Sequence, residues 1–161
     1  MITQSALKDL FDYKDGDLYW KISPSKQIKI GAKAGNTKSN GYLRVGINYK
    51  QYSLHRLIFM MHHGYVPDYI DHIDGDKANN RIENLRAASH SENLYNRKFQ
   101  KNNTSGVKGV SYEKQYKKKW KAKISVDGKE MSIGRFETLE EAKKAIKATR
   151  EKLHGFFANH G

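Results

Sequence analysis

The segment from Asp71 to Asn93 sets a carboxylate, an imidazole and several amides at spacings that suit hydrolysis of a phosphodiester bond. That reaction needs an activated water, neutralisation of charge growing on the phosphate, and stabilisation of the leaving 3′ oxygen; one hard cation supplies two of these. Asp71 offers a carboxylate oxygen and Asn93 an amide oxygen, which suit Mg²⁺ or Mn²⁺. The segment therefore predicts a nuclease that uses one divalent metal.

His72 directly follows the carboxylate and is the natural general base, since an imidazole has an ordinary pKa of about 6.5. Neighbouring side chains on a strand point to opposite faces, so both residues can reach one phosphate only at a bend or strand end. Asn84 could accept a hydrogen bond from the other ring nitrogen and fix the tautomer, or it could simply pin a loop. Asn80 is interpreted as structural.

Four elements must position these groups. The predicted order is strand, polar loop, strand and helix, over residues 69–72, 73–81, 83–86 and from about His90 onwards. Ser89 and Glu92 form a capping-box pattern, which starts the helix and sets Asn93 on its first turn. From there Asn93 can face back toward the first strand and share a metal with Asp71.

The flanking segments predict an α+β chain. Upstream, DLYWKI, GYLRVGI and KQYSLH favour a small sheet, and HRLIFMMHHG favours a core helix that ends at Gly64, with His55 packed inside it. Downstream, three strands and one helix are expected, with a type I′ hairpin at Asp127-Gly128 and a capping box of Thr138 and Glu141. Along residues 120–126 apolar side chains alternate with cationic ones, so one sheet face should be cationic.

Composition limits the partners and the metal chemistry. The 161-residue chain has a formal net charge of +13 and a pI near 9.8, which favours a nucleic acid partner. It has no cysteine, so any metal is held by oxygen and nitrogen ligands and a structural zinc is not expected. With no long apolar run or secretion signal, we expect a soluble cytoplasmic protein. The polar stretch 99–106 suggests a linker, giving domains 1–100 and 101–161.

Other interpretations of the same residues were weighed. A calcium loop starting at Asp74 fails because Asn79 takes the place of the required glycine and Leu85 that of the final glutamate. Asp74 and Asp76 are therefore turn formers. The run Lys117–Lys119 is either a solvated turn or a phosphate contact. Four arginines flank the predicted site and could hold substrate phosphates: Arg56, Arg81, Arg86 and Arg97.

Residues 42–97, with GYLRVGI, LHRLIF, DHIDGDKANNRIENLR and SENLYN, resemble the HNH homing endonucleases of bacteriophages that lack zinc-binding cysteines. The resemblance implies a ββα-metal fold, with His72 as the motif's first histidine and general base and Asn84 as its middle asparagine. It also implies that Asp71 is a metal ligand and that Asn93 replaces the final histidine ligand. In this sequence the final ligand is an amide rather than an imidazole.

Residues 105–160, with GVKGV, KKWKAKI, GRF, EEAKKA and LHG, are similar to the AP2/ERF DNA-binding domain, which in phages is often fused to HNH nucleases. In that family the three-stranded sheet lies in the major groove of DNA. The similarity implies a set of DNA contacts on this chain: Lys108, Lys119, Lys121, Lys123 and Arg135, with Trp120 as a contact or packing residue.

The function predicted is a metal-dependent endonuclease on double-stranded DNA whose first domain cleaves while its second domain binds the duplex; the resemblance implies the homing type. With one site per chain, a monomer that nicks is expected. The main alternative is a non-catalytic DNA-binding regulator, and an RNA-binding or RNA-cutting protein is a third possibility. Metal-dependent nicking of plasmid distinguishes the first from the second.

Overall fold

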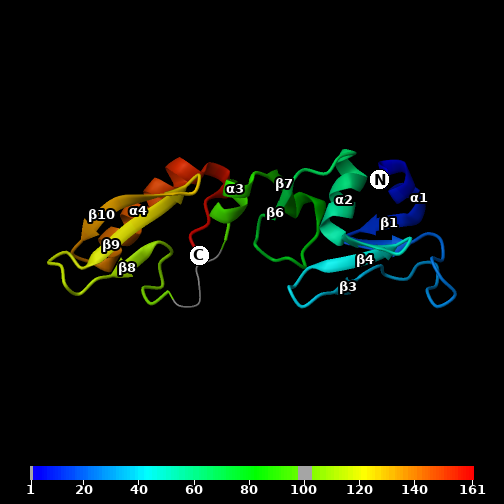
Figure 1. The fold of residues 1–161 in the computed structure, drawn as a ribbon, viewed down its shortest axis with the longest axis horizontal. Coiled ribbons are helices and arrows are strands. Elements are labelled where there is room, and N and C mark those ends of the chain that lie inside the picture. The colour runs from blue at the N-terminus through cyan, green and yellow to red at the C-terminus, as the bar shows by residue number, and fades with distance from the viewer. Residues whose placement is uncertain (1, 98–102) are drawn as a thin grey trace. The chain divides into compact units, whose positions relative to one another are not determined.

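The chain divides into two compact units, Met1–Ala88 and Ser89–Gly161, in a computed structural model that describes residues 2–97 and 103–161 (Figure 1). The boundary predicted between residues 100 and 101 lies outside the described residues, so the domain limits stay a prediction. No helix in the described part of the chain is both long and apolar enough to cross a membrane.

The first unit is built from short antiparallel sheets around two helices. Its elements are α1 (Gln4–Leu10), β1 (Phe11–Lys14), β2 (Asp17–Trp20), β3 (Asn36–Thr37), β4 (Leu43–Ile47), β5 (Lys50–Ser53), α2 (Leu54–His63), β6 (Tyr69–His72), η1 (Ile82–Asn84) and β7 (Leu85–Ala88). The sheets pair β1 with β2, β3 with β4 and β5, and β6 with β7. The predicted small N-terminal sheet is therefore two separate sheets.

Helix α2 supplies much of the first unit's core, as its apolar pattern predicts. Leu54, Leu57, Ile58 and Phe59 are buried, because they recur on one face of the helix. Gly64 ends the helix in the left-handed conformation at φ 79°, and its N–H bonds to the carbonyl of Met60 at 2.9 Å. Ile70 of β6 and Leu85 of β7 are buried in the same core, which anchors the β6–β7 hairpin in the first unit.

The second unit is a three-stranded sheet against one long helix. Its elements are α3 (His90–Tyr95), β8 (Val110–Tyr112), β9 (Trp120–Val126), β10 (Lys129–Phe136), α4 (Leu139–His154) and η2 (Gly155–Phe157). The antiparallel strands lie in the order β10-β9-β8, and α4 packs on β9 and β10. The core is small, formed by Val110, Ala122, Ala142 and Ile146. The predicted α+β class and the sheet-on-helix architecture are confirmed.

Local signals gave several element ends correctly. Helix α3 begins at His90 with the predicted capping box of Ser89 and Glu92. Asp127 and Gly128 have φ values of 49° and 77°, as a type I′ hairpin requires. The second capping box is half formed: Thr138 caps Glu141 at 3.2 Å.

The Glu141 carboxylate instead accepts from the N–H of Glu137. The strand predicted over 83–86 begins only at Leu85. A short 3-10 turn precedes it, closed by a bond from the N–H of Asn84 to the carbonyl of Arg81 at 2.9 Å.

Candidate active site

Asp71 and His72 are the last two residues of strand β6 and are both buried, at 4% and 5% exposure. In the antiparallel hairpin Asp71 lies opposite Arg86, and His72 lies opposite Leu85. The strand ends at His72, and the carbonyl of this residue accepts the N–H of Gly75, which turns the chain into the loop. The strand end that the chemistry requires is therefore present.

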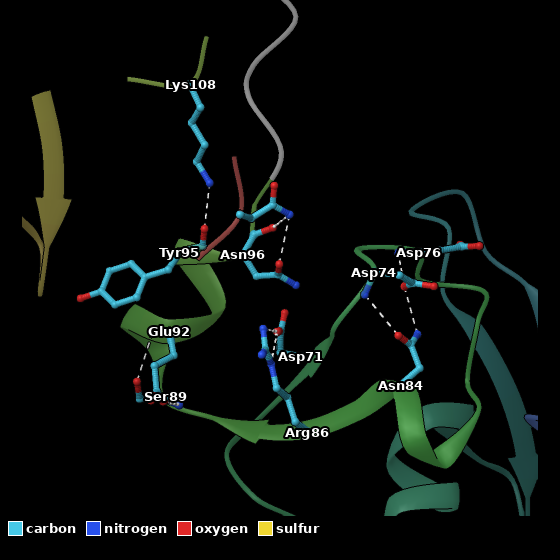
Figure 2. Close-up of polar contacts among 11 residues, drawn as sticks. Asp71, Asp74, Asp76, Asn84, Arg86, Ser89, Glu92, Tyr95, Asn96 and Lys108 are labelled. Atoms are coloured by element: carbon cyan, nitrogen blue, oxygen red, sulfur yellow. Dashed lines mark hydrogen bonds and ion pairs between the residues drawn. The ribbon is translucent and has the colours of Figure 1, made fainter. Parts of the chain in front are cut away.

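Asp71 is held by an ion pair with Arg86. Its Oδ2 accepts from Nε at 2.8 Å and lies 2.7 Å from Nη2, as Figure 2 shows. The two side chains are only 5% and 19% exposed, so the guanidinium compensates a carboxylate that burial alone would disfavour. The register of the hairpin brings these residues together. The sequence predicted a phosphate contact for Arg86, and the structure pairs it with Asp71.

The imidazole of His72 is hydrogen-bonded to Asn80. Nε2 lies 3.0 Å from Oδ1 of Asn80, whose own Nδ2 donates to the carbonyl of Ala78 at 3.1 Å. The second bond fixes the amide so that its oxygen faces the ring, and an oxygen can only accept. Neutral His72 therefore carries its hydrogen on Nε2, and Nδ1 is the nitrogen able to take a proton.

Asn80 is the functional residue that the sequence argument missed, since it was interpreted as structural. It is 2% exposed, and it makes the contact with His72 that was expected of Asn84. Its only signal in the sequence is general: a buried imidazole needs a partner, and the loop offers several asparagines. Nothing in their spacing indicates which of them reaches the ring.

Asn84 pins the loop that follows β6. Its Nδ2 donates to Oδ1 of Asp74 at 3.0 Å and to the carbonyl of Asn79 at 2.8 Å, and its Oδ1 accepts from the N–H of Asp74 at 3.2 Å (Figure 2). Burial raises the pKa of Asp74, but bonds from the Asp76 N–H and the amides of Asn79 and Asn84 outweigh it and hold that pKa below its ordinary value. Asn84 therefore holds the loop between Asp74 and Asn79 in place.

Two further rings lie against His72. The ring of His55 meets it edge to face with centroids 5.3 Å apart, and the ring of Tyr42 lies 6.1 Å away. Burial lowers the pKa of His55 to about 4, helped by the neighbouring His72 and Arg56. His55 is thus neutral near pH 7, as a packed histidine should be, and it adds no charge beside the candidate base.

Asn93 lies on α3, in the second unit, and its N–H bonds to the carbonyl of Ser89 at 3.1 Å. Contacts within that unit anchor the helix: the Tyr95 ring stacks on His154 with centroids 3.8 Å apart, and the Lys108 ammonium donates to the carbonyls of Tyr95 and Arg97. Figure 2 shows the Lys108 bond to Tyr95. The metal-binding role of Asn93 stays a prediction.

The predicted donor set would suit a hard cation. Asp71 is a buried carboxylate, Asn93 is an amide, and the chain has no cysteine. Among the described residues no group of three or more His, Cys, Asp or Glu side chains forms a closed metal cage. A cation with so few protein ligands keeps waters and takes phosphate oxygens, which is the habit of Mg²⁺.

The cations predicted to contact DNA have different surroundings. Lys121 and Arg135 lie 3.7 and 2.5 Å from Glu113, and Lys123 lies 2.7 Å from Glu130. Lys119 is exposed, and Trp120 packs against the core of the second unit.

Lys108 is half-buried and donates to the carbonyls of Tyr95 and Arg97 at the end of α3. Burial, helped by Arg150 and Arg97, lowers its pKa to about 8. In the first unit Arg56 donates to the carbonyl of Asp68 at 3.2 Å. Arg81 lies 3.9 Å from Asp15 in an exposed pair. The Arg97 carbonyl accepts from Lys108, and the Arg97 N–H donates to the carbonyl of Leu94 at 3.3 Å.

Comparisons with known proteins identify similar sequences. Residues 52–95, from β5 to the end of α3, match the HNH endonuclease family model. The chain is 39% identical to Protein 3.8 of Escherichia phage T7, over 68% of this chain and 91% of that protein. It is 34% identical to the uncharacterized HNH endonuclease L560 of Acanthamoeba polyphaga mimivirus, over 65% of this chain and 54% of that protein. No solved structure gives a significant match.

Proposed function

We propose that this chain, whose residues 52–95 match the HNH endonuclease family model, is a divalent-metal-dependent endonuclease that hydrolyses phosphodiester bonds in double-stranded DNA. The observation that carries the proposal is the end of β6, where a buried His72, with Nε2 bonded to Asn80, follows the carboxylate of Asp71. A histidine held in one tautomer beside a hard oxygen donor is suited to activate water.

In the proposed reaction Nδ1 of His72 takes a proton from a water molecule. The resulting hydroxide attacks the phosphorus, and the bond from phosphorus to the leaving 3′ oxygen breaks. Asp71 and Asn93 would hold one Mg²⁺ or Mn²⁺, which when bound supplies neutralisation of the phosphate charge and of the leaving oxygen. Asn80 keeps the ring in the productive tautomer, and Asn84 keeps the loop that carries Asn80 in place.

Arg86 is a positioning residue in this scheme, because its guanidinium orients the Asp71 carboxylate. Arg56, Arg81 and Arg97 remain proposed phosphate contacts. The second unit is proposed as the DNA-binding part, in the manner of an AP2/ERF-like sheet, and the protein is proposed to act as a monomer in the cytoplasm of an infected bacterium. A role in homing is part of the same proposal.

The test is cleavage of supercoiled plasmid by purified protein, with Mg²⁺, with Mn²⁺ and with EDTA. We expect nicking that either metal supports, that EDTA abolishes and that His72→Ala abolishes. His63→Ala is the matched control, since His63 is an exposed histidine that packs on Phe59 and Tyr65 and should nick as the wild type does.

If the wild-type protein binds plasmid but does not nick it with any metal, the proposed activity is wrong and a non-catalytic DNA-binding regulator takes its place. If His72→Ala nicks at the wild-type rate, the base has been assigned wrongly. Competition between duplex DNA and duplex RNA for the protein tests the third possibility, because a preference for RNA would contradict a DNA substrate.

A further inference from the structure

The loop between β8 and β9, residues 113–119, is rich in positive charge. It contains four lysines, all exposed: Lys114, Lys117, Lys118 and Lys119. Within the described part of the chain none of these four ammonium groups takes part in an ion pair within 4.0 Å, whereas Lys121, Lys123 and Arg135 of the sheet do. Their charge is therefore available to a polyanion.

Ion pairing, rather than net charge, separates this loop from the sheet beside it. The strands β9 and β10 carry Lys121, Lys123, Lys129 and Arg135 against Glu130, a net charge of +3, and the loop carries four lysines against Glu113, also +3. Three of the four sheet cations lie in ion pairs with Glu113 or Glu130. Phosphate binding depends on charges that release counterions, so the loop offers more unpaired cations to a phosphate backbone than the sheet does.

Arg135 fixes this loop on the sheet. Its Nη2 lies 2.5 Å from the Glu113 carboxylate, and its Cζ lies 3.5 Å from the centroid of the Tyr116 ring. Its Nη1 is buried and has no hydrogen-bond partner among the described residues. The N–H of Glu113 bonds to the carbonyl of Lys119 at 2.7 Å and closes the loop. A guanidinium covered in this way is poorly placed to bind phosphate.

We propose that the loop 113–119 is the principal phosphate-binding element of the second unit on duplex DNA, and that Arg135 is a positioning residue that clamps it. The inference rests on the proposed function and names the part of the DNA-binding unit that makes the grip. Arg135 acts through its planar stack on Tyr116 and its bond to Glu113, which a lysine cannot reproduce.

The first test measures the affinity of the full-length protein for a labelled DNA duplex by fluorescence anisotropy, in EDTA to prevent cleavage, over a series of salt concentrations. Each lysine lost from a phosphate contact should lower the slope of log K against log salt by about 0.9. We expect this for Lys117→Ala, Lys118→Ala or Lys119→Ala, and a smaller change for Lys121→Ala. Lys143→Ala on α4 is the control of equal charge and should leave the slope unchanged.

The second test concerns Arg135. Arg135→Lys and Arg135→Ala should weaken binding equally, and Tyr116→Ala, which alters an exposed ring, should cause a similar loss that is not additive with theirs. If Arg135→Lys keeps the wild-type slope while Arg135→Ala lowers it by about 0.9, Arg135 contacts phosphate directly and the clamp is refuted. If Arg135 variants lose their fold by circular dichroism, Tyr116→Ala alone decides between the outcomes.

Failure of this inference is distinguishable from failure of the proposed function. A wild-type protein that does not bind the duplex contradicts the DNA-binding role itself. A wild-type protein that binds with a steep salt dependence, which the loop variants leave unchanged, contradicts only the assignment to the loop. Tighter binding of an RNA duplex through the same lysines would contradict DNA as the partner, but it would still support the loop as the phosphate-binding element.

Discussion

Replacing Asn80 by alanine tests the assignment of the catalytic tautomer. The bond between His72 Nε2 and Asn80 Oδ1 is 3.0 Å long and buried, so removing the amide leaves a polar N–H without this partner. An unsatisfied buried group costs about 1–3 kcal/mol of folding free energy. We expect the unfolding free energy of the first unit, measured by denaturant titration, to fall by about that amount.

Asn80→Ala should also lower the rate of nicking by more than its loss of folding stability explains. The amide favours the tautomer with hydrogen on Nε2, and a bias of about 1.4 kcal/mol is worth about a factor of ten in the population of reactive Nδ1. Loss of partners that orient such ligands commonly costs 10–100-fold, and we expect kcat of nicking to fall by roughly this factor. KM should stay near the wild-type value, because Asn80 is 2% exposed and does not reach DNA.

Two further variants complete the test. Asn80→Asp keeps an oxygen acceptor facing Nε2 and should recover much of the rate. Asn79→Ala is the matched control in the same loop, since the half-buried Asn79 side chain donates to Asp74 at 2.7 Å, whereas it is Asn80 that bonds to His72. Folded Asn80→Ala protein with the wild-type kcat would refute the reasoning, and so would equal losses in Asn79→Ala.

Three other predictions concern stability. Arg86→Ala should destabilise the first unit by about 3–5 kcal/mol by breaking a buried ion pair with Asp71, and Asp71→Asn in the same chain should recover part of it in denaturant titrations. Folding lowers the pKa of His55 from 6.5 to about 4, so the unfolded chain binds a proton at a higher pH than the folded chain does. The free energy of unfolding should therefore fall by on the order of 3 kcal/mol between pH 6.5 and pH 4. His55→Phe should flatten this pH dependence, and a variant with the same pH dependence as the wild type would contradict the prediction. Gly109→Ala should lower thermal stability far more than Gly128→Ala, although both glycines have positive φ. A Cβ at position 109 would lie 2.5 Å from the carbonyl oxygen of Lys123, whereas a Cβ at position 128 would lie in open space.

Local sequence rules predicted the parts of the fold that depend on neighbouring residues. The capping box at Ser89, the type I′ turn at Asp127 and the end of α2 at Gly64 are all set within a few residues. The alternation of Ala122 and Ile124 with Lys121 also held, because a strand on a helix buries every second side chain. These signals need no knowledge of distant contacts.

The site required more than local rules. Asp71 meets Arg86 because the antiparallel register sets them opposite each other, and that register depends on the whole hairpin. Asn80 rather than Asn84 reaches His72 because the loop between them turns through several side-chain bonds. Composition alone could show that the loop is polar, but not which amide faces inward.

Local sequence rules also could not predict which surface cations are paired with acidic side chains, and this pairing affects DNA binding. The similarity to the AP2/ERF domain and the alternation along residues 120–126 predicted the sheet as the DNA-binding surface, but Glu113 and Glu130 pair with three of its cations. Electrostatic attraction over a Debye length depends on net charge, whereas a phosphate contact depends on a cation that can leave its present partner at little cost. The exposed lysines 117–119 meet that condition better than Arg135 does, which is why their removal should change the salt dependence most.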